Sequence, residues 1–213
     1  MASSVGARQV VLFDLGGVLI DWNPRHLYRK LIEDETTMEW FLAEVCHTTW
    51  NEEQDRGRSF AAAIEEAASR HPDHRPLIEA YFARWAEMMA GEIEGAVAVL
   101  AELKDAGHEL HALTNWLAET FPFARERFAF LDWFESILVS ADVGLIKPDP
   151  AIFQLLLERI GRTPAECIYI DDNARNIAAA AALGFDAIAF EGAAQLRDAL
   201  GRRRLVAGRP EQD

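Results

Sequence analysis

The residues with the clearest chemical potential are carboxylates that directly follow short apolar runs. Asp14 follows the run Val10–Phe13 and precedes a glycine pair, and Asp171 and Asp172 follow the run Cys167–Ile170. Carboxylates held close together repel one another unless a cation lies among them. Aspartate oxygens suit a hard ion, above all Mg²⁺. If the fold brings the two runs together, these residues predict a magnesium site.

Other polar residues also follow apolar runs. Thr114 and Asn115 follow the run that begins at Glu109, and Lys147 lies in the stretch Gly144–Pro148. The chain has only three lysines, and arginine supplies the rest of its positive charge. A compact ammonium differs chemically from a guanidinium, so Lys147 is a candidate for binding an anion.

The order of apolar runs and helical patterns predicts an α/β fold. Continuous apolar runs predict five strands, which are Gln9–Phe13, Glu109–Leu113, Ser136–Ser140, Cys167–Ile170 and Asp186–Phe190. Patterns with helical spacing lie between the later runs, at Ala96–Ala106, Pro150–Ile160 and Ala174–Leu183. This alternation is typical of a doubly wound, Rossmann-like parallel sheet. Ligands bind such sheets beyond the carboxyl ends of the strands, so the polar residues above are expected at one edge.

The segment 23–89 interrupts the alternation. It has amphipathic stretches and no convincing strand, and the stretches are Met38–Val45, Ser59–Arg70 and Leu77–Met89. We therefore expect residues 23–89 to form an inserted α-helical cap domain, and residues 1–22 and 90–213 to form the α/β core domain. Short linkers are expected near Asp21–Pro24 and Ala90–Gly95.

Composition restricts the partners. The net charge of −14 argues against nucleic acid, which needs a basic surface, but it allows a small phosphorylated metabolite that enters a local cationic pocket. No long apolar run and no signal-peptide pattern are present, so we expect a cytoplasmic protein without a membrane partner. The two cysteines, Cys46 and Cys167, are not expected to form a disulfide.

The four polar stretches, taken in order, resemble the four motifs of the haloacid dehalogenase superfamily, and the resemblance covers about residues 9–200. Asp14 matches the nucleophile of the first motif, and Thr114 in "LHALTN" matches the hydroxyl of the second. Lys147 in "GLIKPDP" matches the lysine of the third. Asp171 and Asp172 in "YIDDNARN" match the acidic pair of the fourth. The resemblance implies a Mg²⁺-dependent hydrolase of small phosphomonoesters that works through an aspartyl-phosphate.

The resemblance also implies a set of ligands. Asp14, Asp172 and the backbone carbonyl of Gly16 would bind the metal, and Asp171 would act directly or through water.

The transferred phosphoryl group carries negative charge, which Lys147, the Thr114 hydroxyl and the backbone N–H groups of the Gly16–Gly17 turn are suited to stabilise. Asn115, Trp116 and Trp50 are further candidates for binding substrate, although Trp50 is equally consistent with core packing.

One position departs from the family pattern. Most phosphatases of this superfamily have a second aspartate two residues after the nucleophile, which acts as a general acid and base, and here that residue is Gly16. Asp21 is a candidate replacement, with His26 and His47 behind it, although a solvated or capping role for Asp21 is also consistent.

Three functions stay open at this stage. The first is a phosphatase for good leaving groups such as sugar 1-phosphates, like the superfamily branch with "DLGGV"-type first motifs. The second is a metal-free 2-haloacid dehalogenase, which the pair Asp171–Asp172 disfavours because a haloacid carboxylate gains nothing from two more negative charges. The third is a non-catalytic member that binds a ligand.

Overall fold

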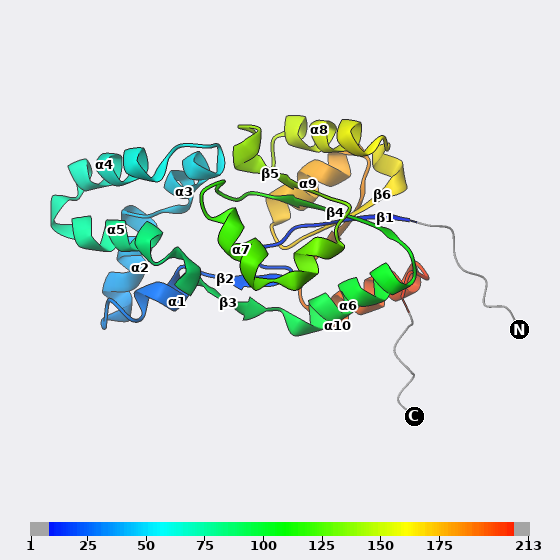
Figure 1. Ribbon diagram of the computed structural model, residues 1–213, viewed down its shortest axis with the longest axis horizontal. Coiled ribbons are helices and arrows are strands. Elements are labelled where there is room, and N and C mark those ends of the chain that lie inside the picture. The colour runs from blue at the N-terminus through cyan, green and yellow to red at the C-terminus, as the bar shows by residue number, and fades with distance from the viewer. Residues whose placement is uncertain (1–8, 207–213) are drawn as a thin grey trace, which may run out of the picture.

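A parallel sheet of five strands forms the centre of the computed structural model, which describes residues 9–206 (Figure 1). In spatial order, the strands are β5 (Ser136–Val139), β4 (Glu109–Thr114), β1 (Val10–Phe13), β6 (Cys167–Asp171) and β7 (Asp186–Ala189). Every neighbouring pair is parallel. The predicted doubly wound sheet is confirmed, and each of its strands overlaps an apolar run.

Helices cover both faces of the sheet, as Figure 1 shows. The side chains of β1 alternate between the two cores, with Val11 and Phe13 in one and Val10 and Leu12 in the other. Helices α6 (Glu94–Asp105), α7 (Phe121–Arg127) and α10 (Ala193–Arg202) pack in the first core. Helices α8 (Pro150–Ile160) and α9 (Ala174–Leu183) pack in the second. Apolar residues on both faces of β1 explain its continuous hydrophobic run.

Two helices have the predicted bounds because their first turns are capped. The Asp149 side chain accepts a hydrogen bond from the N–H of Ala151 at the start of α8. The Asn173 side chain accepts one from the N–H of Arg175 at the start of α9. Such caps satisfy donors that have no partner within the helix.

The two expected linkers include paired strands, a feature that the sequence did not predict. Strands β2 (Ile20–Trp22) and β3 (Met89–Glu92) form an antiparallel ribbon, in which Ile20 pairs with Glu92 and Asp21 with Gly91. The partners lie far apart in the sequence, and short strands carry little periodicity of their own. The ribbon joins the inserted helices to the sheet at both ends of residues 23–89.

Residues 23–89, the helical segment, contain five α-helices that lie to one side of the sheet (Figure 1). The helices are α1 (Arg25–Tyr28), α2 (Glu35–Glu44), α3 (Thr48–Asp55), α4 (Phe60–Arg70) and α5 (Arg75–Ala83). The expected helix Leu77–Met89 is too long, because α5 stops at Ala83 and a 3₁₀ turn, Trp85–Met88, leads into β3. The break allows the Trp85 ring to pack 5.5 Å from the Trp22 ring.

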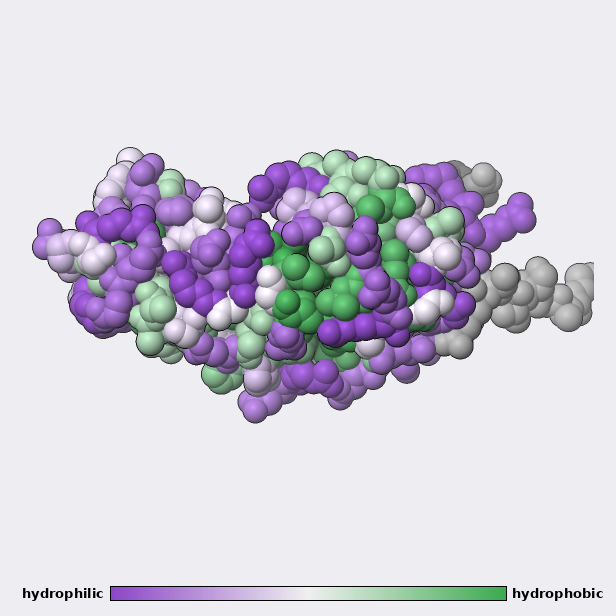
Figure 2. Space-filling view, turned by 90° about the horizontal axis from the view of Figure 1, so that it is seen from above, coloured by the Kyte–Doolittle hydropathy of each residue, from purple (hydrophilic) through white to green (hydrophobic). Residues whose placement is uncertain are grey.

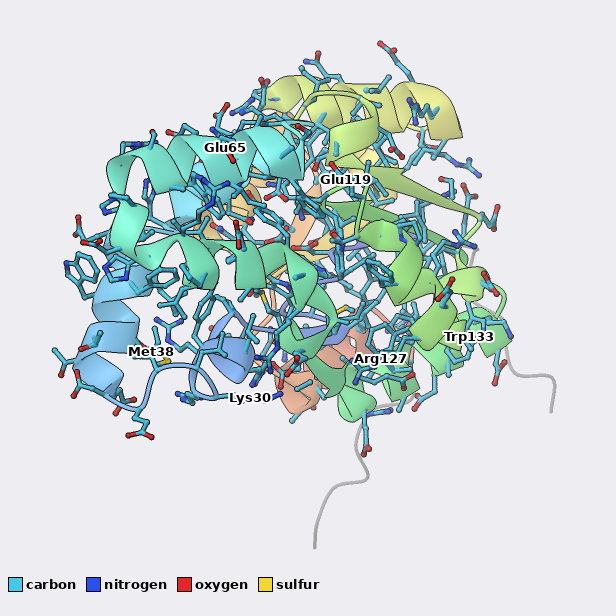
Figure 3. All side chains as sticks on the ribbon, turned by 60° about the vertical axis from the view of Figure 1, so that its left-hand side comes forward. Lys30, Met38, Glu65, Glu119, Arg127 and Trp133 are labelled. Atoms are coloured by element: carbon cyan, nitrogen blue, oxygen red, sulfur yellow. The ribbon has the colours of Figure 1, made fainter. Side chains whose placement is uncertain are left out.

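The helical segment contacts the loops that follow the strands. Phe60 donates its N–H to the carboxylate of Glu119 (3.3 Å), which follows β4 and is labelled in Figure 3. Ser140, directly after β5, donates its hydroxyl to the carbonyl of Asp55 (2.7 Å). Because β4 and β5 carry these loops at their carboxyl ends, the helical segment lies across the edge where polar residues are expected.

The exterior has both polar and apolar regions. Seen from above, hydrophilic residues cover most of the helical segment on the left, and hydrophobic residues gather in the middle of that face (Figure 2). None of the helices within residues 9–206 has the length and apolar character that crossing a bilayer requires.

Cys46 and Cys167 are buried free thiols, which confirms the expectation of no disulfide between them.

Candidate active site

Lys147 is the centre of the site, although it belongs to a loop after β5. Its side chain is buried, with 2% of the residue exposed. Its Nζ lies 2.9 Å from Asp14 Oδ2 and donates to Asp171 Oδ2 (2.8 Å) and to the carbonyl of Leu113 (2.9 Å). The negative charges of Asp14 and Asp171 raise the pKa of Lys147 and outweigh the opposing effect of burial. The ammonium therefore stays charged inside the protein.

Asn115 fixes the backbone that carries this lysine. Its amide nitrogen donates to the carbonyl of Lys147 (3.0 Å), and its amide oxygen accepts from the N–H of Lys147 (2.8 Å). A paired bond of this kind holds the loop against the end of β4. Asn115 therefore positions Lys147, besides lining the cavity described below.

Asp171 is fully buried (0% exposed) and surrounded by donors. Besides Lys147, it accepts from the hydroxyl of Tyr169, from the amide of Asn176 (3.1 and 3.0 Å) and from the N–H of Asn173 (2.8 Å). Burial alone would raise its pKa, but the charge and hydrogen bond of Lys147, with the other donors, lower it. Both oxygens of Asp171 are engaged, so it serves as a fixed anion.

Fewer hydrogen-bond donors stabilise the negative charges of Asp14 and Asp172 than that of Asp171. Asp14 Oδ1 accepts from the N–H of Leu15 (2.7 Å), yet burial, with the charges of Asp171 and Asp172, raises the pKa of Asp14 to about 7 despite Lys147. Burial and the charge of Asp171 also raise the pKa of Asp172. Asp14, Asp171 and Asp172 each place an oxygen within 4.8 Å of the others. A cluster of three carboxylates with one ammonium has an excess of negative charge, which favours binding of a cation.

Gly17, in the turn after Asp14, leaves room for the carboxylate of Asp172. A Cβ at Gly17 would lie 2.3 Å from Asp172 Oδ2, so the carboxylate of Asp172 rests directly on this residue. The N–H of Gly17 donates to the carbonyl of Ile20 (2.9 Å). The expectation that Gly17 donates its N–H to a bound anion is therefore not supported, because the tight turn already uses that N–H.

A cavity of about 360 Å³ opens above these residues. Asp14, Gly16 and Asp172 line it from the core, with Asn115 and Trp116 from the loop after β4. The helical segment and its ribbon contribute Trp22, Asn23, Pro24, Arg25, Asn51, Asp55 and Trp85. An adjoining cavity of about 470 Å³ shares several of these residues and reaches Lys147. A small organic molecule has room between the helical segment and the carboxylates.

The aromatic predictions had mixed outcomes. Trp116 lines the first cavity as expected. The placement of Trp50 in the pocket was wrong, because its ring packs against Tyr81 (5.2 Å) and Phe82 (5.6 Å) in the interior of the helical segment. Trp22 and Trp85 line the cavity instead, and their indole N–H groups are buried without a partner in the described part of the chain. Trp22 lies close behind the first motif and could have been noticed, whereas nothing in the sequence distinguished Trp85.

Thr114 is buried at the end of β4, as predicted, but it lines neither cavity. The candidate replacement acids also lie elsewhere. The side chain of Asp21 is 49% exposed and pairs with His26 (3.0 Å). His47 accepts a hydrogen bond from the N–H of Trp50 (3.1 Å) at the start of α3. None of these three residues is among those that line the two cavities.

A second acidic group lies at the opposite end of β4. Glu109, His111 and Glu135 come close enough to share a ligand. Arg162 Nη2 lies 2.5 Å from Glu109 Oε2, and His111 Nε2 lies 3.0 Å from Glu109 Oε1. The hydrogen bond from Arg162 is the largest influence on Glu109 and lowers its pKa. This group has one arginine for two carboxylates, whereas the group around Asp14 has one lysine for three.

Comparisons with known proteins agree with this geometry. A family model described as haloacid dehalogenase-like hydrolase matches residues 9–184. A sesquiterpene phosphatase of Aspergillus oryzae is 29% identical over 182 residues, which cover 83% of this chain and 86% of that protein. An (S)-2-haloacid dehalogenase of Burkholderia cepacia is 30% identical over 93 residues, which cover 44% and 40%. The fold is similar to that of a magnesium complex of a Bacteroides thetaiotaomicron family member, with a TM-score of 0.68 and 20% identity, over 87% of this chain and 94% of that one.

Proposed function

The chain belongs to the haloacid dehalogenase-like hydrolases, and we propose that it is a Mg²⁺-dependent phosphatase of small phosphomonoesters that works through an aspartyl-phosphate. One observation carries this proposal. Asp14 and Asp171 pair with the buried Lys147, and Asp172 lies within 4.8 Å of both carboxylates. Asp14 and Asp172 also line a cavity of small-molecule size. A site of this charge suits a metal ion and a phosphoryl group together.

The oxygen atoms at this site are of the kind that binds Mg²⁺. Asp14 and Asp172, with the backbone carbonyl of Gly16, would hold the ion through hard oxygen ligands. Asp171 would act through water, because Lys147 and the other donors occupy both of its oxygens. When bound, Mg²⁺ offsets the negative charge between the nucleophile and the phosphoryl oxygens.

The remaining chemistry comes from the chain. A carboxylate oxygen of Asp14 attacks phosphorus, the bond from phosphorus to the ester oxygen breaks, and water later hydrolyses the aspartyl-phosphate. Lys147 lies beside Asp14 and stabilises negative charge on the phosphoryl oxygens. We retain the Thr114 hydroxyl as a prediction for the same role.

We propose that the helical segment is a cap domain of residues 23–89 over a core of residues 1–22 and 90–213. Its contacts with Glu119 and Ser140 support its place over the carboxyl ends of the strands. Trp22 and Trp85 offer aromatic surface to the cavity, and Asn51 and Arg25 add polar groups to its lining. This lining suits a leaving group with an apolar face and several oxygens, such as a sugar. A cytoplasmic location remains a prediction.

The test is phosphate release from a panel of phosphomonoesters with Mg²⁺ and with excess chelator. We expect turnover only with Mg²⁺, loss in chelator and full recovery when Mg²⁺ is restored, because Asp14 cannot approach a dianion without the cation. Circular dichroism in chelator controls for unfolding. Full hydrolysis in excess chelator, or halide release from 2-chloropropionate without phosphate release, would contradict the proposal and favour the dehalogenase.

Gly17→Ala tests whether Asp172 is a ligand of the metal. We expect half-maximal activity to need about 10–100-fold more Mg²⁺, the scale seen when residues that support metal ligands are replaced, because the new Cβ displaces Asp172. Gly107→Ala is the matched control, since Gly107 has a similar φ of +80° and nothing within 4 Å of an added Cβ. Both variants share a backbone cost of about 1–2 kcal/mol. An equal Mg²⁺ requirement in both would count against Asp172 as a ligand.

A further inference from the structure

The proposed phosphatase lacks an obvious proton donor. Gly16 has no side chain, and Asp21, His26 and His47 do not line the cavity. We propose that Asp55, from the helical segment, is the general acid that protonates the leaving alcohol and the general base that later activates water. This inference rests on the phosphatase function proposed above.

The position of Asp55 supports this role. It is the last residue of α3, only 6% exposed, and it lines the first cavity together with Asp14 and Asp172. It also lines the adjoining cavity that reaches Lys147. A leaving group held between the nucleophile and the helical segment therefore has Asp55 in the wall of its own cavity.

Two sets of hydrogen bonds hold Asp55 in place. Ser140, directly after β5, donates its hydroxyl to the carbonyl of Asp55 (2.7 Å) and accepts from the N–H of Trp116 (3.0 Å). Tyr81 donates to the amide oxygen of Asn51 (2.8 Å), and the Asn51 amide donates to Asp55 Oδ2 (3.2 Å). The backbone carbonyl of Asp55 is thus hydrogen-bonded to Ser140 on the sheet side of the cavity. Asn51, within the helical segment, orients its carboxyl group.

The surroundings of this carboxyl group suit proton transfer. Within residues 9–206, no arginine, lysine or histidine forms an ion pair with Asp55. Burial and the charge of Glu52 raise the pKa of Asp55 to about 7, and the charge of Lys147 and the bond from Asn51 oppose the rise only in part. A buried carboxyl group without a cation is costly for stability. Both protonation states are accessible near neutral pH, as a residue with both tasks requires.

The proton balance is complete with the chain and water. In the first step, Asp14 bonds to phosphorus, the electron pair of the breaking P–O bond stays on the ester oxygen, and the proton of Asp55 moves to that oxygen, which leaves as an alcohol. In the second step, the Asp55 carboxylate takes a proton from water, and the oxygen of that water bonds to phosphorus. The bond from phosphorus to Asp14 breaks, so phosphate leaves and both aspartates return to their starting states.

The test compares two leaving groups in Asp55→Asn. Single-turnover release of the alcohol, with enzyme in excess, isolates the first step. We expect release from an alkyl phosphate to fall by about 10²–10⁴-fold and release of phenol from an aryl phosphate to change by less than about tenfold, because a phenolate leaves without protonation. Asp21→Asn is the matched control, since Asp21 is half exposed and outside both cavities, and it should behave as wild type.

A second variant separates chemistry from structure. A Cβ at Gly16 would meet only the Cβ of Trp22, at 4.0 Å, so the backbone at this position leaves room for the first atom of a side chain. Gly16→Asp in the Asp55→Asn protein should restore alkyl phosphate turnover at least tenfold, which repair of packing around Asp55 would not explain. Equal losses on both substrates without this rescue, or no loss on either, would overturn the assignment of Asp55. No phosphate release by the wild-type protein from either ester would overturn the proposed function as well.

Discussion

Asp14→Asn is expected to abolish phosphate release from alkyl and aryl esters alike, by on the order of 10⁴–10⁶-fold, the scale at which removal of a nucleophile acts. The amide keeps the size of the side chain, and its oxygen can still accept from the N–H of Leu15 (2.7 Å). It cannot attack phosphorus. The loss on both esters distinguishes this variant from Asp55→Asn, which should spare the first step on aryl esters.

The fold should survive this substitution. Burial already disfavours the charge of Asp14 and raises its pKa to about 7, so a neutral side chain relieves a cost. Lys147 keeps Asp171 and the carbonyl of Leu113 as partners. We expect the thermal midpoint to stay the same or rise.

Mass spectrometry measures the intermediate directly. Wild-type protein quenched during turnover should gain one phosphoryl group on the peptide that carries Asp14, and Asp14→Asn should gain none. Retained turnover in Asp14→Asn, or a phosphoryl group on another residue, would exclude the covalent mechanism.

Lys147→Met is expected to reduce the free energy of unfolding by about 3–5 kcal/mol, because it leaves buried carboxylates without their cation. Asp14 and Asp171 both lie within 3 Å of the lysine Nζ, and the surrounding strands exclude water from Asp171. Activity should be lost too, since Lys147 stabilises the phosphoryl oxygens.

Lys30→Met is the matched control. Lys30, labelled in Figure 3, pairs with Glu87 (2.8 Å), but its side chain is 54% exposed. Exposed ion pairs contribute roughly 0–1 kcal/mol. Urea unfolding of both variants in the presence of chelator measures the difference without a contribution from bound metal.

A double variant examines the cause of the loss. Asp171→Asn in the Lys147→Met protein removes one of the carboxylates left without a cation. The double variant should therefore lose less free energy of unfolding than the sum of the losses in the two single variants. Equal losses for Lys147→Met and Lys30→Met, or additive losses in the double variant, would contradict the view that one lysine balances this cluster.

The sequence by itself determined the sheet and the core of the site. The three inner strands, β4, β1 and β6, are paired on both sides and buried along their whole length, so their apolar runs are readable without neighbours. The edge strands β5 and β7 are only partly buried. The order of runs and helical patterns requires parallel strands, and parallel strands bring their carboxyl ends to one edge. Asp14, Lys147 and Asp171 meet there because Asp14 and Lys147 come after strands of the sheet and Asp171 is the last residue of one. The sequence also showed the absence of a side chain at Gly16.

Only the tertiary structure decided which residues of the helical segment face that edge. The ribbon of β2 and β3 pairs distant residues and leaves no periodic pattern in either. Trp50 and Trp85 look alike in the sequence, yet one packs inside the helical segment and the other lines the cavity, because that choice depends on how the helices are rotated against one another. Asp55 ends an ordinary polar helix, and its burial arises from contacts with Ser140 and the neighbouring loops. Local periodicity specifies which face of a helix is apolar, whereas the element that a polar residue meets is set by packing across the whole chain.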